Sequence, residues 1–332
     1  MNAKEDNGFM NLRCSWVSQE RRKEALEVLY ADALPTERAE LVEAALEAAS
    51  LGELDLEGLA LAERDGQAVG AILCTLQSDG TMFVWPPTVV PGAEEGEKVA
   101  DALLTLVRAR VDSTPWCAIA QALIEPEQEL SAGRLERNGF PHLVDLLFLQ
   151  KSLNSVLKNE ERDRSPLVVT SETFDEARNQ QLFARVLERT YEGSLDCPEL
   201  NGGRTGEEAL VSHRGSHWNP ALWWLYRSEQ GEQVGVALVR EHAPRAVWEL
   251  VYFGIVPEVR GRGFGRAVLW DVLQKARKAG VELVYLSVDV RNRPALNLYK
   301  SLGFVELGMK RVFARFGPRW RKPKGDDLEA GQ

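Results

Sequence analysis

A glycine-rich turn between a predicted strand and a predicted helix constrains this chain more than any other feature. Residues 248–256 are rich in β-branched and aromatic side chains, as in a half-buried strand. Pro257 lacks an N–H group and so ends the hydrogen-bond ladder. Over residues 267–279 the apolar side chains recur at helical spacing, and Gly280 suits a helix C-terminus. The intervening turn must therefore carry the backbone directly from a sheet into a helix.

This turn, Arg-Gly-Arg-Gly-Phe-Gly-Arg over residues 260–266, has the composition of an anion-binding site. Its glycines lack Cβ atoms where the backbone must bend sharply and approach a ligand closely. The unpaired N–H groups and the dipole of the following helix add positive charge to that of the arginines. A diphosphate is the ligand that this arrangement suits best. It is neither a Walker loop, since no Gly-Lys-Ser/Thr follows, nor a dinucleotide fingerprint, since Arg266 replaces the last glycine.

A second motif lies downstream, at residues 292–304, and reads Asn-Arg-Pro-Ala-Leu-Asn-Leu-Tyr-Lys-Ser-Leu-Gly-Phe. The two motifs, R-x-x-G-x-G and N-x-x-A-x-x-L-Y-x-x-x-G-F, are separated by a predicted helix and strand. In this order they resemble motifs A and B of the GNAT N-acetyltransferase superfamily, in which the glycine turn binds the pyrophosphate of acetyl-CoA. The resemblance implies that acetyl-CoA is the co-substrate and that the residues binding it are Gly254, Ile255, Val256, Arg260, Gly261, Arg262, Gly263, Phe264, Gly265, Arg266 and Asn292.

The same resemblance assigns roles in acetyl transfer. A backbone N–H at Ile255 or Val256 would polarise the thioester carbonyl, and Gly254 suits a bulge or close approach beside it. Tyr299 matches the motif B tyrosine, which acts as general acid towards the CoA sulfur; its alternative role is to pack the helix onto the sheet. Asn292 matches the position that contacts pantetheine, and it can also cap the helix that begins near Pro294.

The general base follows from a narrower resemblance. Two tandem units with the active one second resemble mycothiol synthases, a group of GNAT enzymes with a glutamate at the start of the motif A strand, here Glu249. Strand alternation predicts that Glu249, Val251, Phe253 and Ile255 share one face. In ribosomal-alanine-type acetyltransferases the base lies at the position of Ser287, which cannot serve, and Asp289 is the reserve candidate.

Recurrent turn residues indicate that the chain contains an internal duplication. Four pairs of landmarks are offset by about 165 residues, and the order of strands and helices around them matches. These pairs are Gly66 and Gly231, Gly70 and Gly235, Pro91 and Pro257, and Gly139 and Gly303. After Pro91, however, the first copy carries three glutamates and no arginine where a diphosphate would bind. We therefore expect this copy not to bind acetyl-CoA.

The predicted fold class is α+β: two tandem GNAT-like units, each a mixed, mostly antiparallel sheet flanked by helices. The predicted divisions are a degenerate domain over 1–150, a polar linker over 151–166, an active domain over 167–316 and a disordered tail over 317–332. The loop over residues 196–205 should cover the acceptor or merely connect two helices.

Composition limits the partners of the chain. Its 332 residues carry a net charge of −10, which disfavours nucleic acid, and no long apolar segment indicates a membrane span or leader. The four cysteines and four histidines show no metal-binding spacing, so we expect no metal. The sequence thus predicts a cytoplasmic, monomeric N-acetyltransferase that acts on a small-molecule amine. The alternatives are a protein N-acetyltransferase and an acyl-CoA-binding module without turnover.

Overall fold

The computed structural model of the protein describes residues 12–153, 167–215, 218–242 and 246–321. The chain divides into two compact units. The first contains the described residues up to Leu143 together with Arg311–Trp320, and the second contains Val144–Lys310 with Arg321.

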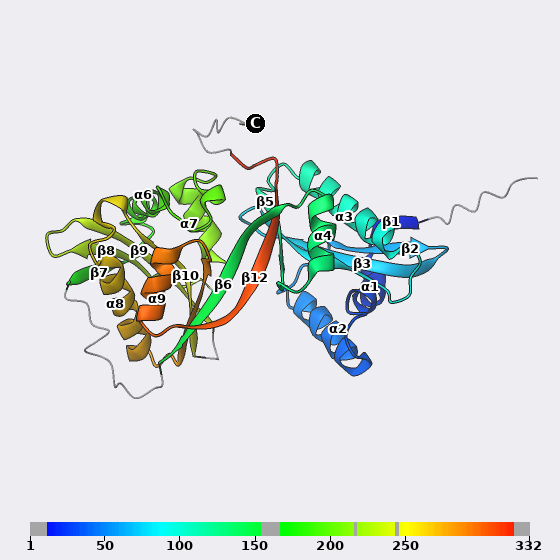
Figure 1. Ribbon diagram of the computed structural model, residues 1–332, viewed down its shortest axis with the longest axis horizontal. Coiled ribbons are helices and arrows are strands. Elements are labelled where there is room, and N and C mark those ends of the chain that lie inside the picture. Colours follow the sequence, from blue (N-terminus) through cyan, green and yellow to red (C-terminus); the bar gives the residue numbers. More distant parts are fainter. Residues whose placement is uncertain (1–11, 154–166, 216–217, 243–245, 322–332) are drawn as a thin grey trace, which may run out of the picture. The chain divides into compact units, whose positions relative to one another are not determined.

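The first unit is a mixed sheet flanked by helices (Figure 1). Its strands follow the order β1-β2-β3-β4-β5-β12, in which the β4–β5 pair is parallel and the others are antiparallel. Its elements in chain order are β1 (Leu12–Trp16), η1 (Gln19–Arg21), α1 (Arg22–Leu29), α2 (Pro35–Ser50), β2 (Leu59–Arg64), β3 (Gln67–Leu76), β4 (Thr81–Val89), α3 (Gly96–Ser113), β5 (Ile119–Ile124), α4 (Glu129–Arg137) and the end of β12 (Val305–Phe316).

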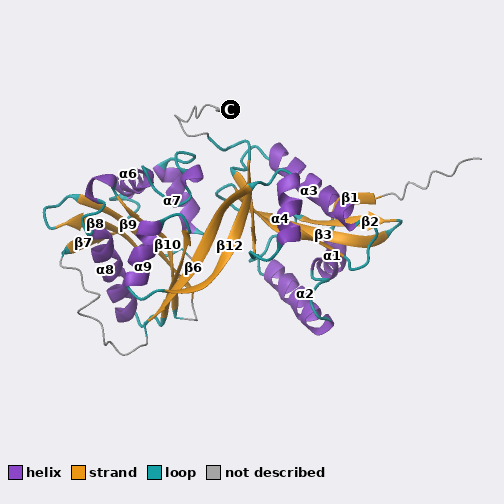
Figure 2. Ribbon diagram, in the orientation of Figure 1, coloured by secondary structure: helices purple, strands orange, loops and turns teal. Residues whose placement is uncertain are grey.

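The second unit has the same plan (Figure 2). Its strands follow the order β6-β11-β10-β9-β8-β7, with a parallel β10–β11 pair among antiparallel neighbours. Its elements are β6 (His142–Ser152), β7 (Val169–Thr173), α6 (Gln180–Tyr191), η2 (Pro198–Leu200), α7 (Gly206–Arg214), η3 (Pro220–Leu222), β8 (Trp223–Ser228), β9 (Gln233–His242), β10 (Val247–Ile255), η4 (Pro257–Val259), α8 (Phe264–Lys278), β11 (Leu283–Asp289) and α9 (Arg293–Ser301). The predicted fold class is confirmed.

Each sheet includes a strand from the other half of the sequence. β6 precedes every other element of the second unit, yet it pairs with β11 from Leu146 to Ser152. Residues Arg311–Phe316 of β12, at the far end of the chain, pair with β5 of the first unit. The units therefore divide within β6 and within β12, whereas the sequence placed the divisions at residues 150 and 316. β12 and β1 were not predicted at all, and residues 154–166 and 322–332 lie outside the described parts of the chain.

Helices cover both faces of the second sheet. A Cβ atom added at Gly254 of β10 would meet Thr190 of α6, whereas one added at Gly265 of α8 would meet Phe253 and Ile255. Because consecutive strand residues point to opposite faces, α6 and α8 lie on opposite sides of β10. Buried aromatic and aliphatic side chains fill the space between the layers, and Trp223 and Trp224 of β8 belong to this core.

The parallel pair in each sheet is short. β10 pairs with β11 only from Val247 to Glu249, although both strands continue beyond this point. β4 and β5 of the first unit likewise pair over only three residues. Where such strands separate, their facing N–H and C=O groups lose each other as partners and can bind a ligand instead. Among the described residues, no helix is both long and apolar enough to cross a membrane.

Candidate active site

A cavity of about 450 Å³ lies where β10 and β11 separate. Four parts of the second unit line it: the two strands, the end of α6 with the segment after it, the glycine turn, and the facing surfaces of α8 and α9. The lining residues are Thr190, Gly193–Asp196, Leu250–Ile255, Val259–Gly261, Gly265, Ser287, Val288, Asn292, Pro294, Ala295, Leu298 and Tyr299.

The glycine turn presents backbone N–H groups at one end of this cavity. Gly261 and Gly263 have φ angles of +73° and +91°, which side chains other than glycine rarely adopt. Among the described residues, the N–H groups of Gly261, Gly263, Phe264 and Gly265 make no hydrogen bond to the backbone. These donors lie at the N-terminus of the fifteen-residue helix α8, which is the arrangement that the predicted anion site requires; the anion site itself stays a prediction.

The ladder between β9 and β10 distinguishes the two proposed oxyanion donors. The N–H group of Val256 donates to the carbonyl of Val234 at 3.0 Å, so it is already paired. Alternate residues of a strand donate to the same neighbour, so the N–H group of Ile255 points away from β9. It therefore faces the side from which β11 has separated, so of the two candidates Ile255 is the one whose N–H group is not paired with β9.

The arginines of the turn contribute less charge to the cavity than the sequence suggested. Arg260 donates to the carbonyls of Thr190 (2.8 Å), Glu192 (2.6 Å), Gly193 (3.2 Å) and Ile255 (2.9 Å). Its guanidinium thus holds the end of α6 against the end of β10. Arg266 donates to Ser301 of α9 at 2.9 Å. Arg262 is exposed and packs over the ring of Phe264.

Tyr299 and Asn292 project from α9 into the cavity. Tyr299 is only 6% exposed, packs edge-on against Phe304, and has no hydrogen-bond partner for its hydroxyl among the described residues. Burial raises the pKa of this phenol well above its usual value, so it stays protonated at neutral pH. Asn292 caps α9 by accepting a hydrogen bond from the N–H of Ala295 at 3.3 Å. The capping role is therefore established, and its position in the cavity wall leaves the ligand role open.

Glu249 is the last residue of β10 that pairs with β11, where its partner is Tyr285. Its carboxylate accepts hydrogen bonds from Arg240 at 3.1 Å and lies 2.9 Å from His242 Nε2, which also contacts the Tyr285 hydroxyl at 2.9 Å. The sequence analysis identified none of these three partners, because they come from two neighbouring strands. Glu249 does not itself line the cavity, but the residues that follow it, from Leu250, do.

The expected shared face of Glu249, Val251, Phe253 and Ile255 is wrong. The register between β9 and β10 shifts between Leu250 and Tyr252, which adds one unpaired residue to β10. This bulge reverses the alternation. Glu249 therefore lies on the face of Tyr252 and Gly254, beside α6, and Phe253 and Ile255 lie on the face of α8.

Asp289, the reserve candidate for the base, is fully buried and already hydrogen-bonded. It accepts from the Arg291 side chain at 2.7 and 3.0 Å and from the N–H groups of Arg291 and Cys197. Burial alone would raise the pKa of Asp289, but these hydrogen bonds outweigh it and hold the pKa below its usual value. A carboxylate stabilised in its ionised form by so many donors is a weak proton acceptor.

Asp196 is a cavity residue that sequence reasoning noted only as the first residue of a loop. Its Oδ1 accepts from the N–H of Asp289 at 2.9 Å. Burial raises the pKa of Asp196, partly offset by this bond and by one from Asn292. The sequence could not indicate that Asp196 lies in the cavity, because the loop is held there by contacts with β11, more than ninety residues away along the chain.

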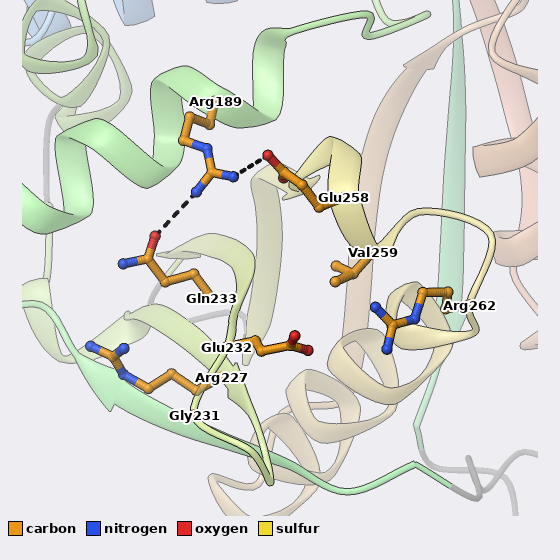
Figure 3. A pocket seen from close by; sticks show the side chains of 8 residues that line it. All are labelled: Arg189, Arg227, Gly231, Glu232, Gln233, Glu258, Val259 and Arg262. Carbon is orange, nitrogen blue, oxygen red and sulfur yellow. Dashed lines mark hydrogen bonds and ion pairs between the residues drawn. The ribbon is translucent and has the colours of Figure 1, made fainter.

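A second cavity of about 380 Å³ is lined in part by Glu258 and Val259 of η4 (Figure 3). Val259 lines both cavities. The side chains of Arg189 and Glu258 point toward each other and form an ion pair, and Arg189 also reaches Gln233 at 3.4 Å. Arg227, Arg262 and Glu232 complete a lining of nearly balanced charge, with none of the catalytic candidates.

The first unit has no comparable anion site at the start of α3. Buried Arg64 donates to the carbonyl of Glu94 and pairs with the carboxylate of Glu95 at 3.3 Å. Glu95 and Glu97 place negative charge at the first turn of the helix, where a bound diphosphate would be repelled. Among the described residues, no cluster of His, Cys, Asp and Glu could hold a metal ion.

The part of the sequence that forms this site matches a known protein family. Residues 187–304, which contain the glycine turn and α9, match the Acetyltransferase (GNAT) family. The chain carries a GNAT acetyltransferase domain.

Relatives and solved structures agree with this assignment. The chain is 29% identical over 253 residues to a mycothiol acetyltransferase of Kocuria rhizophila, a match that covers 74% of this chain and 80% of the relative. It is 34% identical to the mycothiol acetyltransferase of Thermomonospora curvata over 41% of this chain and 44% of the relative. A GCN5-related N-acetyltransferase of Sphaerobacter thermophilus shares the fold, with a TM-score of 0.58 at 21% identity over 94% of this chain and 96% of the other.

The contacts of Arg260 predict a role in holding this GNAT domain together. Replacing Arg260 with Gln removes hydrogen bonds to four backbone carbonyls, and we expect a loss of about 2 kcal/mol of stability. The corresponding fall in Tm, measured by circular dichroism, is roughly 4–8 °C. Arg262→Gln is the matched control, because it removes the same charge from the same turn without these bonds. Equal melting temperatures for the two variants would contradict the assignment.

Proposed function

We propose that this protein transfers an acetyl group from acetyl-CoA to a primary amine of a small molecule. One observation carries the proposal: a single cavity is lined at one end by Gly261 and Gly265 of the glycine turn and elsewhere by the buried Tyr299. The turn can hold the diphosphate of the donor, and the separated strands can hold its extended pantetheine arm through their free backbone groups. The acetyltransferase domain and the mycothiol acetyltransferase relatives support this reading.

The proposed reaction is a direct attack on the thioester. The amine nitrogen bonds to the carbonyl carbon, and the N–H of Ile255 stabilises the oxyanion that develops there. The proton leaving the nitrogen passes to Glu249, directly or through one water molecule. When the carbon–sulfur bond breaks, the CoA sulfur takes a proton from Tyr299. The raised pKa of this phenol keeps it in the donor form throughout the neutral range.

Acetyl-CoA binding tests the proposal directly. We expect titration calorimetry to give one site per chain, in the second unit. Gly263→Glu should weaken this binding by about 100-fold or more, because it places a carboxylate against the diphosphate and two such charges repel by several kcal/mol at close range. Gly96→Glu, at the corresponding helix start of the first unit, should leave binding unchanged. Two sites per chain, or full affinity in Gly263→Glu, would refute the proposal.

Tyr299→Phe tests the general acid. The substitution removes the proton donor and little packing area, so kcat should fall by roughly 10²–10⁴-fold while acetyl-CoA affinity stays nearly constant. Tyr252→Phe is the control, since Tyr252 is a partly buried tyrosine of the same cavity and its hydroxyl is hydrogen-bonded to Thr190 at 2.8 Å. An unchanged rate in Tyr299→Phe would leave Tyr299 with a packing role only.

Glu249→Gln tests the general base. Glutamine keeps the shape of the side chain but cannot accept the proton, so kcat should fall by roughly 10²-fold. The loss of rate on acidification, which protonation of a base produces, should disappear from the pH–rate profile. Glu241→Gln removes an exposed carboxylate from the neighbouring strand and serves as the control. Normal turnover by Glu249→Gln would exclude Glu249 as the base.

A further inference from the structure

The carboxylate of Asp196 is held rigidly in the wall of the main cavity. Asp196 and Cys197 exchange hydrogen bonds with Asp289: Asp289 N–H donates to Asp196 Oδ1 at 2.9 Å, and Cys197 N–H donates to Asp289 Oδ2 at 3.1 Å. Arg291 bonds Asp289 and also clamps Glu199 of the same loop at 2.6 and 2.9 Å. The loop is therefore fixed beside the end of β11 at Asp196 and at the residues that follow it, Cys197 and Glu199.

The backbone of the loop has an unfavourable conformation next to Asp196. Cys197 has a φ angle of +45°, a left-handed conformation that costs free energy for a residue other than glycine. At the start of the loop, Arg260 holds the carbonyls of Glu192 and Gly193. The segment from Glu192 to Glu199 is thus anchored at each end, and Asp196 lines the same cavity as Tyr299 and Asn292.

Within the described part of the chain, the negative charge of Asp196 is offset only in part, by the nearby charge of Arg291. Among the described residues, no Lys, Arg or His forms an ion pair with it, although burial raises its pKa. Arg291, the nearest guanidinium in this network, is bonded to Asp289 and Glu199. Glu249 differs, because Arg240 and His242 both contact its carboxylate. A partly buried carboxylate without a cationic partner is costly, and a cationic ligand removes this cost.

We propose that Asp196 binds the protonated amine of the acceptor as an ion pair and positions it opposite Tyr299, before the proton is removed. The inference rests on the proposed function, and it makes the site selective for acceptors that arrive as ammonium ions. Asp196 is then a substrate-binding residue, and proton removal remains with Glu249. The loop between α6 and α7 would set the charge preference of the enzyme.

Asp196→Asn tests this role. Asparagine keeps an oxygen that can accept from Asp289 N–H, so the loop should stay in place while the negative charge is lost. The probes are glucosamine, cysteine ethyl ester and tyramine, each with acetyl-CoA, and kinetics are measured on the amine that the unmodified protein acetylates fastest. We expect the KM for this amine to rise about 10-fold to 100-fold, the range for loss of a charged hydrogen-bonded contact. The kcat at saturation and the KM for acetyl-CoA should change less than about threefold.

Glu192→Gln is the matched control, because it removes one negative charge from the same loop through an exposed side chain. Its KM for the amine should stay unchanged, and the Tm values of both variants should match that of the unmodified protein. An unaltered amine KM in Asp196→Asn, or an equal rise in both variants, overturns the inference. If the unmodified protein binds acetyl-CoA but acetylates none of the three amines, the proposed small-molecule function fails instead, and this inference fails with it.

Discussion

The separation of β10 from β11 after Glu249 is the constraint on which the rest of the second unit depends. Parallel strands normally satisfy each other's backbone groups, so two strands can part only where other partners are provided. β9 pairs with one edge of β10 as far as Ile255. β6 pairs with the edge of β11 that faces away from β10, as far as Asp289. Pairing with β9 and β6 therefore holds the two strands in place, and the backbone groups in the gap between them remain available to a ligand.

The positive character of the anion site comes mainly from the backbone. Arg260 and Arg266 lie in the glycine turn, but their guanidinium groups bond protein atoms at the end of α6 and on α9. The unpaired N–H groups of the turn and the N-terminus of α8 lie beside the cavity, whose lining includes Gly261 and Gly265. For the proposed donor this arrangement has an advantage, since fixed dipoles can hold a diphosphate without requiring long side chains to become ordered.

Sequence reasoning predicted those parts of the structure that depend on local chemistry. The glycine turn, α8 and α9 follow from φ requirements, helix periodicity and capping, and each was placed within a few residues. The bulge in β10 could not be predicted, because a single extra residue leaves no mark in the alternation of a mostly apolar strand. Asp196 and the partners of Glu249 meet their targets only through pairing between distant strands. The hydrogen bonds of Arg260 and Arg266 to protein atoms were missed for a related reason, because charge in a motif does not reveal whether protein or ligand will neutralise it.

The exchange of strands between the halves of the sequence has a consequence for how this protein is made. A ribosome releases β5 long before residues Arg311–Phe316, yet these residues complete its edge. Throughout synthesis of the second half, the nascent first unit carries an open strand edge of the kind that templates aggregation. β6 in turn emerges before any strand it will join. Completion of the first sheet therefore waits until β12 has been made, and a premature stop between β6 and β11 leaves both sheets unfinished.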